Sequence, residues 1–213
     1  MSVPAKICGL TTSEALDAAL AGGAAFVGAV SFPKSPRHLD LIAAAALFER
    51  ARGRAKVVAV TVDADDALLT EIALILKPDL VQLHGSETPE RAARARLLTG
   101  AEVIRALPVR TAADLDAAAA FAPVVDWLMF DAKTPTGSTL PGGVGARFDW
   151  NLLAGRRFVR PWFLAGGLSP DNLAQAVRIT GAPAVDVSSG VESVPGVKDP
   201  DRIAAFLEAA RSA

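Results

Sequence analysis

The chain has 213 residues, enough for one domain with a full hydrophobic core, and its 22 basic and 23 acidic side chains leave a net charge of −1. This balance gives no electrostatic reason to expect a nucleic-acid or membrane partner. Although 51% of the residues are hydrophobic, no apolar run reaches the roughly 18 residues that would span a bilayer. The N-terminal MSVPAKICG lacks the basic and apolar regions of a secretory signal, and one cysteine cannot form an internal disulfide, so we expect a soluble, cytoplasmic protein.

Short apolar runs alternate with Ala-rich segments of helical spacing along the chain. The apolar runs predict strands at 5–9, 25–32, 56–63, 79–85, 102–109, 126–133, 160–167 and 184–190. The segments between and after them predict helices at 13–22, 39–53, 65–77, 88–99, 111–121, 149–154, 170–180 and 199–211. Helix starts are indicated by Thr12 or Ser13 before Glu14, by Asp65, and by Ser169 followed by Pro170.

Eight strand–helix units in 213 residues are close to the minimum for an α/β fold of the (β/α)8 type, a closed parallel barrel with outer helices. We therefore predict a single domain over 1–213. A doubly wound open sheet is the alternative, but the first strand–helix turn lacks the G-x-G-x-x-G pattern, and the eighth unit completes a closed count. The longest irregular segment, 132–148, follows the sixth strand, and such a loop is often a functional lid; its glycines are Gly137, Gly142, Gly143 and Gly145.

Barrels of this kind build their active sites at the carboxyl ends of the strands. Side chains two residues apart on a strand share a face, so Lys6 pairs with Cys8 and Gln82 with His84. Polar residues where apolar ones would otherwise fill the barrel indicate a solvated site. The strand ends carry Lys6, Cys8, Asp63, Gln82, His84, Asp131, Gly166, Gly167, Asp186 and Ser188.

Two loops resemble a phosphate site. Gly166 and Gly167 follow the seventh predicted strand directly before a helix, and Ser188, Ser189 and Gly190 follow the eighth. Glycines allow the backbone to approach a ligand, and exposed N–H groups with hydroxyls bind a dianion. Either loop alone is equally well read as an ordinary glycine turn. Together, at the two strands that usually bind phosphate in this fold, they predict a phosphate site.

Seven motifs in order resemble the phosphoribosylanthranilate isomerase family over nearly the whole chain: KICGLTT (6–12), FPKSPRHL (32–39), VQLHGSE (81–87), MFDAKTP (129–135), FDW (148–150), FLAGGLSPDN (163–172) and VDVSSGVES…GVKD (185–199). The resemblance implies an aldose–ketose isomerase of tryptophan biosynthesis. It would catalyse the Amadori rearrangement of N-(5-phosphoribosyl)anthranilate to 1-(2-carboxyphenylamino)-1-deoxyribulose 5-phosphate. It also implies a small-molecule substrate, no metal or organic cofactor, and a monomer or homodimer.

By the same resemblance Cys8 is the general base and Asp131 the general acid. A thiol acts as a base only as thiolate, so we expect its pKa to fall from about 8.5 through the charge of Lys6. An acid must keep its proton near neutral pH, so we expect the pKa of Asp131 to rise from about 3.9 through burial or a carboxylate such as Asp186. Without the motifs, a lone cysteine would be inert core and an aspartate at a strand end a helix cap.

In the family that this chain resembles, the arginine that matches Arg37 pairs with the anthranilate carboxylate, which a guanidinium group fits bidentately. Without the resemblance, Arg37 would be interpreted as a solvated surface residue. Gln82 and His84 line the pocket or, slightly favoured, make structural hydrogen bonds. Without CxxC or HExxH a metal site is not expected. The Gly-rich loop departs from the family, with Val144 where a small polar residue is frequent and Ala146 where a lysine is common.

Two alternative functions remain. The related sugar isomerase of histidine biosynthesis uses two aspartates and a substrate with two phosphates. Here Cys8 stands where one aspartate is expected, and no matching Gly-rich loop follows the third strand. A non-catalytic phosphosugar-binding barrel predicts binding without turnover, against which the Cys8–Asp131 pair argues.

Overall fold

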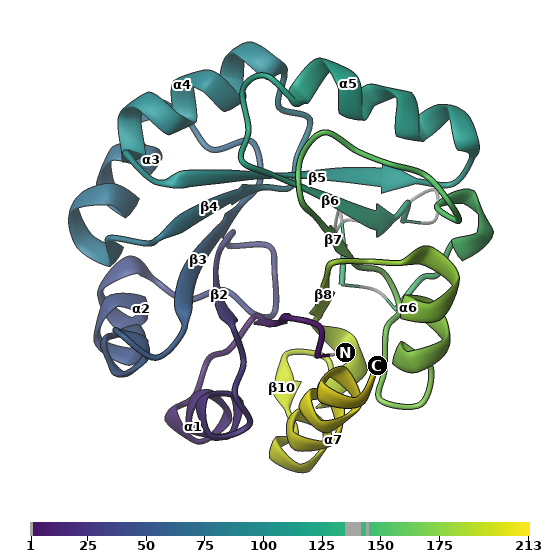
Figure 1. Ribbon diagram of the computed structural model, residues 1–213. Helices are drawn as coiled ribbons and strands as arrows, with labels where there is room; N and C mark the ends of the chain where they lie inside the picture. Colours follow the sequence, from purple (N-terminus) through teal and green to yellow (C-terminus); the bar gives the residue numbers. More distant parts are fainter. Residues whose placement is uncertain (1, 135–141, 144) are drawn as a thin grey trace.

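Eight parallel strands close into a barrel in chain order (Figure 1). The computed structural model describes residues 2–134, 142–143 and 145–213. Because β8 pairs with β1, this sheet has no free edge, which confirms the barrel and excludes the doubly wound alternative. The strands are β1 (Ala5–Cys8), β2 (Phe26–Ser31), β3 (Lys56–Thr61), β4 (Leu80–Leu83), β5 (Glu102–Val109), β6 (Trp127–Ala132), β7 (Trp162–Leu164) and β8 (Ala184–Val187).

Helices surround the strands on the outside of the barrel (Figure 1). They are α1 (Ser13–Ala21), α2 (Leu41–Phe48), α3 (Asp66–Glu71), α4 (Pro89–Thr99), α5 (Ala117–Phe121), α6 (Leu173–Thr180) and α7 (Pro200–Ser212). Several predicted helices are continued or replaced by tighter or wider turns: 3₁₀ turns at Glu49–Ala51, Ala112–Asp116 and Trp150–Leu152, and a π-helical turn at Ile72–Leu76.

Two of the three predicted helix caps are confirmed. The side chain of Thr12 accepts a hydrogen bond from the N–H of Ala15, and that of Asp65 accepts one from Leu68. The prediction that a helix begins at Pro170 is wrong. The backbone N–H of Ser169 donates to Oδ1 of Asn172 at 2.9 Å, which stabilises a turn, and α6 begins only at Leu173. The residues after β7 therefore remain a loop at the carboxyl end of the barrel.

An antiparallel hairpin of β9 (Glu192–Val194) and β10 (Val197–Lys198) lies between β8 and α7. The sequence pattern did not predict it, because strands of three and two residues are too short to show alternation.

Strand alternation divides the core into two clusters. Apolar side chains that point outward pack against the helices, and those that point inward fill the barrel. At the amino ends of the strands, Phe26, Trp127 and Phe163 pack together with ring centroids 4.9 to 5.7 Å apart. Val58 and Met129 lie fully buried in the same inner cluster. Aromatic packing thus fills one end of the barrel and leaves the polar residues to the other.

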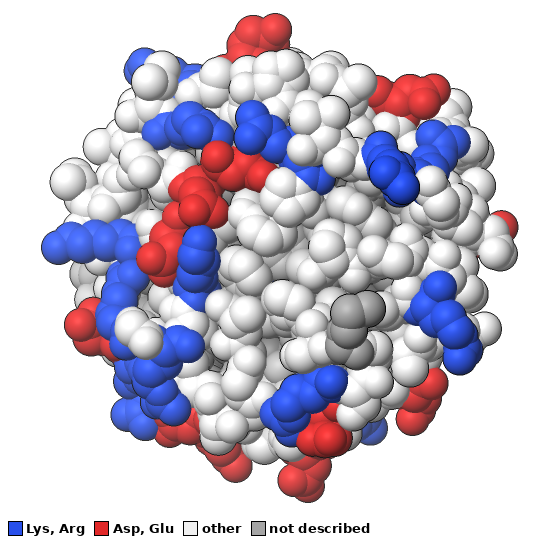
Figure 2. Space-filling view, viewed as in Figure 1, with Lys and Arg blue, Asp and Glu red and all other residues white. Residues whose placement is uncertain are grey.

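Figure 2 shows charged side chains of both signs around the perimeter of the molecule, with mainly uncharged residues at the centre of that face. The Lys56–Glu102 ion pair joins β3 to β5, and Arg96–Asp126 joins α4 to the residue before β6. Within the described ranges, no helix combines the length and hydropathy needed to cross a membrane.

Candidate active site

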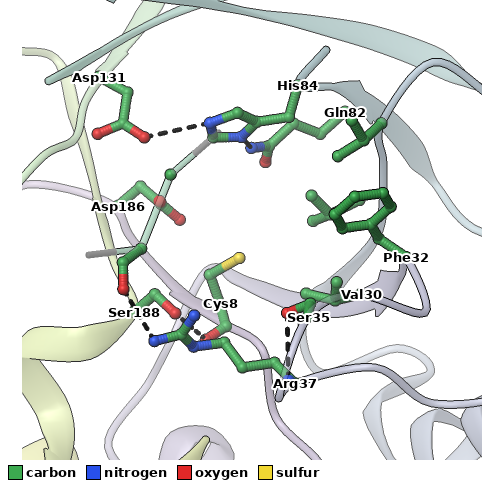
Figure 3. Close-up of a pocket in the computed structure, with 14 residues that line it drawn as sticks. Cys8, Val30, Phe32, Ser35, Arg37, Gln82, His84, Asp131, Asp186 and Ser188 are labelled. Atoms are coloured by element: carbon green, nitrogen blue, oxygen red, sulfur yellow. Dashed lines mark hydrogen bonds and ion pairs between the residues drawn. The ribbon is translucent and has the colours of Figure 1, made fainter. Parts of the chain in front are cut away.

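Side chains at the carboxyl ends of the strands surround one open pocket (Figure 3). Inward alternation brings Cys8 from β1, Gln82 from β4 and Asp131 from β6 to the same cavity. The residues predicted from sequence that line this pocket are Cys8, Arg37, Gln82, His84, Asp131, Asp186 and Ser188.

Lys6 does not line the pocket but lies fully buried within the barrel. The register of β1 and β8 places Lys6 opposite Asp186, and its Nζ contacts Oδ1 of Asp186 at 2.7 Å. Burial by itself lowers the pKa of Lys6, but the charges of Asp186 and Cys8 outweigh it and raise the pKa to about 12. Lys6 is therefore a fixed cation whose main partner is Asp186.

The pKa of Cys8 is raised above its ordinary value of 9.0, so the prediction of a lowered pKa is wrong. Burial is the largest cause, and the carboxylate of Asp186 adds to it. The charge of Lys6 acts in the predicted direction but does not outweigh these effects. The sequence showed the neighbouring cation but not the depth of the thiol in the barrel.

Asp131 on β6 is held by a chain of hydrogen bonds that leads through His84 to Gln82 on β4 (Figure 3). Its Oδ1 accepts the N–H of Ala132 at 2.8 Å, and its Oδ2 lies 3.2 Å from Nε2 of His84. Nδ1 of His84 lies 2.9 Å from Nε2 of Gln82. Asp186, the predicted neighbour of Asp131, is paired with Lys6 instead. His84 and Gln82 thus both line the pocket and orient Asp131.

Arg37 is buried, with 5% of its surface exposed, which excludes a solvated surface role. Its Nε and Nη2 donate to the two carboxylate oxygens of Glu192 at 2.7 and 2.8 Å, and Nη2 also donates to the carbonyl of Gly143 at 3.0 Å. One edge of the guanidinium is therefore occupied by Glu192. Nη1 donates to no acceptor in the part of the chain that the structure describes, and Arg37 lines the pocket.

A second, adjoining pocket is lined by the loops that follow β7 and β8. The N–H groups of Gly166 and Gly167 donate to no acceptor within 2–134, 142–143 and 145–213, which leaves them available to an anion. All of the predicted phosphate residues line this pocket: Gly166, Gly167, Ser188, Ser189 and Gly190.

These glycines are also required by contacts between loops, which sequence reasoning did not foresee. A Cβ on Gly167, whose φ is +64°, would lie 2.3 Å from Cγ of Arg147. A Cβ on Gly190 would lie 1.9 Å from the carbonyl oxygen of Leu168. The absence of side chains therefore allows the loops to pack tightly around the cavity.

The described part of the Gly-rich loop lies against the pocket. A Cβ on Gly142 would approach His84 Nε2 to 2.7 Å and Asp131 Oδ2 to 2.8 Å. Ala146 belongs to the lining of the second pocket. The predictions for Gly137 and Val144 fall outside the described residues.

Sequence reasoning missed Glu192 and Lys198, which are both buried and joined by a contact of 2.5 Å. Both fall within the VDVSSGVES…GVKD motif, which was the one signal available for them. Among the described residues no group of three or more His, Cys, Asp or Glu side chains is arranged to hold a metal ion.

Comparisons with known proteins agree with this architecture. The family model described as N-(5'phosphoribosyl)anthranilate (PRA) isomerase matches residues 5–209. The N-(5'-phosphoribosyl)anthranilate isomerase of Caulobacter sp. (strain K31) is 60% identical over 210 residues, covering 98% of this chain and 99% of the relative.

Among solved structures, phosphoribosyl anthranilate isomerase from Thermotoga maritima superposes with a TM-score of 0.86 at 34% identity, with 98% of each chain covered. A phosphoribosyl anthranilate isomerase in complex with reduced 1-(o-carboxyphenylamino)-1-deoxyribulose 5-phosphate gives a TM-score of 0.84 at 31% identity, again with 98% of each chain covered. The barrel, the converging strand-end residues and the matches over nearly the full length lead to one conclusion: the chain belongs to the phosphoribosylanthranilate isomerase family, a family of enzymes.

Proposed function

We propose that this isomerase converts N-(5-phosphoribosyl)anthranilate to 1-(2-carboxyphenylamino)-1-deoxyribulose 5-phosphate by an Amadori rearrangement, with Asp131 as general acid and Cys8 as general base. The observation that carries the proposal is that both side chains line one pocket from different strands, beside a second pocket lined by the glycine-containing loops after β7 and β8. A sugar bound by its phosphate would thus present its reacting carbons between an acid and a base.

The first step opens the ribose ring. Asp131 gives its proton to the ring oxygen, the bond from C1′ to that oxygen breaks, and the nitrogen lone pair forms a C1′–nitrogen double bond. The contact between Nε2 of His84 and Oδ2 of Asp131 orients the carboxyl group. A general acid that is positioned in this way contributes about 10²- to 10⁴-fold to a reaction rate.

The second step removes the proton from C2′. The Cys8 thiolate takes this proton, the bonding electrons form a C1′–C2′ double bond, and the nitrogen becomes neutral. Protonation of C1′ and loss of the C2′ hydroxyl proton then give the ketone. Because the pKa of Cys8 is raised, the thiolate is the minor form at neutral pH but the stronger base once formed.

Three groups of residues would hold the substrate. The loops after β7 and β8 would bind the phosphate, and Nη1 of Arg37 would meet the anthranilate carboxylate. The bidentate pairing expected from sequence is not available while Glu192 binds Nε and one N–H of Nη2 and the carbonyl of Gly143 accepts the other N–H of Nη2. Phe32 and Val30 add an apolar wall suited to the aromatic ring.

The decisive experiment mixes the purified protein with freshly prepared phosphoribosylanthranilate and follows anthranilate-type fluorescence. We expect a protein-dependent loss of fluorescence that saturates with substrate and is inhibited competitively by inorganic phosphate. Binding of the substrate without any turnover would support the non-catalytic barrel instead, and turnover unaffected by phosphate would remove the two loops from the site.

A further inference from the structure

Glu192 has no free hydrogen-bonding capacity in its carboxylate. Oε1 accepts from Nε of Arg37 at 2.7 Å and from Nζ of Lys198 at 2.5 Å, while Oε2 accepts from Nη2 of Arg37 at 2.8 Å and from the N–H of Gly196 at 3.1 Å. A carboxylate offers about four acceptor sites, so all are used. Glu192 does not line the pocket beside Cys8 and acts on it only through its partners.

The Arg37 side chain is fixed along its length. Its stem crosses Gly9, where φ is +75° and a Cβ would lie 2.6 Å from Cδ of Arg37. The hairpin turn reaches the same segment, since a Cβ on Gly196 would lie 2.8 Å from the carbonyl oxygen of Pro36. The stem is held, Glu192 binds Nε and Nη2, and the carbonyl of Gly143 accepts a second hydrogen bond from Nη2. Among the contacts of the described residues, Nη1 is therefore the nitrogen left for a ligand in the pocket that Arg37 lines.

Lys198 connects this pair to the loop after β8. Its Nζ donates to the carbonyl oxygen of Ser188 at 3.0 Å and contacts the Ser188 hydroxyl at 3.2 Å, and that hydroxyl donates to the carbonyl of Cys8 at 3.2 Å. Burial would raise the pKa of Glu192, but the hydrogen bond from Arg37 and the charge of Lys198 hold it below its ordinary 4.5. Glu192 is therefore an anion between two cations, and the three charges sum to one positive charge.

We propose that Glu192 is a positioning residue that makes Arg37 selective for a ring carboxylate. By binding Nε and Nη2 it selects Nη1 as the guanidinium nitrogen that meets the substrate, and it leaves one net positive charge for one incoming anion. Through Lys198 and Ser188 it also fixes the distance between this subsite and the phosphate loop. The inference rests on the proposed function, because the ligand it recognises is the aromatic carboxylate of that substrate.

The test uses Glu192→Gln with two ligands, reduced 1-(o-carboxyphenylamino)-1-deoxyribulose 5-phosphate and the same compound without the ring carboxyl group. The amide retains the size of Glu192 but turns one acceptor into a donor facing Arg37 or Lys198. We expect the carboxylated ligand to bind about tenfold more weakly, the low end for losing a hydrogen bond to a charged group, and the other ligand to change less than about twofold. The proposal would be overturned if the substitution weakened the binding of both ligands equally, or if it weakened the binding of neither.

The matched control is Glu87→Gln. Glu87 is another buried glutamate bound to a buried arginine, with Arg105 Nη1 at 2.5 Å from its Oε2, but neither residue lines the pocket around Cys8. Both variants should lower the thermal stability, whereas only Glu192→Gln should alter the carboxylate preference. If Glu87→Gln also weakened binding of the carboxylated ligand selectively, the effect would be due to a general loss of stability at this end of the barrel. That result would contradict a positioning role for Glu192.

Arg37→Ala provides the second control. If Glu192 acts through Arg37, adding Glu192→Gln to Arg37→Ala should change the affinity for the carboxylated ligand by less than about twofold, since coupled residues are not additive. Additive losses would overturn the proposal. Should Glu192→Gln not fold, the charge-balanced pair Glu192→Gln with Lys198→Met carries the same two-ligand comparison. Failure of the proposed function is recognised separately, as absent turnover by the wild type.

Discussion

The two sides of the pocket are built by different means. On the side of β1 and β8, Cys8 lies beside the ion pair of the fully buried Lys6 and Asp186, which lines the pocket. On the side of β4 and β6, Asp131 contacts His84, which contacts Gln82, and these hydrogen bonds join side chains that line the pocket. Burial and full charges thus set the proton affinity of the base, whereas local hydrogen bonds orient the acid. Substitutions on the two sides should therefore have different consequences.

The largest effect is expected for Asp131→Asn. Asparagine keeps the shape of the side chain but has no acidic proton, so kcat should fall by about 10²- to 10⁴-fold while the reduced product analogue still binds with near-normal affinity. Steady-state kinetics and a binding titration measure both quantities. Near-normal turnover by a folded, binding-competent variant would remove Asp131 from the acid role.

Cys8→Ala should lower kcat by at least about 10²-fold without unfolding the protein. The thiol lies within an apolar inner cluster, and its removal leaves the Lys6–Asp186 pair in place. Kinetics together with a thermal melt separate the loss of the base from a loss of stability. Near-normal turnover would show that another group removes the C2′ proton.

The raised pKa of Cys8 should be directly measurable. The chain has one cysteine and no tyrosine, so the ultraviolet absorbance change of thiolate formation reports Cys8 alone. The midpoint should lie above pH 9.0 because burial, assisted by Asp186, disfavours the thiolate. Asp186→Asn removes that negative charge and should shift the midpoint downward.

The sign of the linked stability change follows from the same shift. A pKa that is higher in the folded state means that the neutral thiol stabilises the fold below pH 9.0, and that this contribution is lost as the pH rises through the folded-state pKa. Denaturation from pH 8 to pH 11 should therefore show a decline in wild type that Cys8→Ala lacks. A midpoint at or below 9.0 would contradict the account of this side of the pocket.

The smallest effect is expected for His84→Gln. It removes one hydrogen bond to Asp131, so kcat should fall by only about two- to tenfold, with KM little changed. Combined with Asp131→Asn, the substitution should have almost no further effect, because His84 would act through Asp131. A full additional loss in the double variant would assign His84 a separate role in the reaction.

The sequence was sufficient for those features that depend on alternation and order. Strand periodicity predicted eight parallel strands and therefore the meeting of Cys8, Asp131 and the loops after β7 and β8 at one end. It could not predict the net effect on Cys8, because the cation at Lys6 is visible two residues away while burial and the cross-strand Asp186 depend on barrel closure. Likewise, the Arg37–Glu192 pair joins residues 155 positions apart.

The pairing of Lys6 with Asp186 has a consequence for folding, because these residues come from the first and last strands and are 180 positions apart. During synthesis β1 leaves the ribosome long before β8. Burial of an unpaired ammonium group in an apolar barrel has a large desolvation free energy. Lys6 should therefore remain hydrated in every nascent chain that lacks β8. The interior can become dry only when the last strand arrives, which couples completion of the polypeptide to closure of the barrel in one cooperative step.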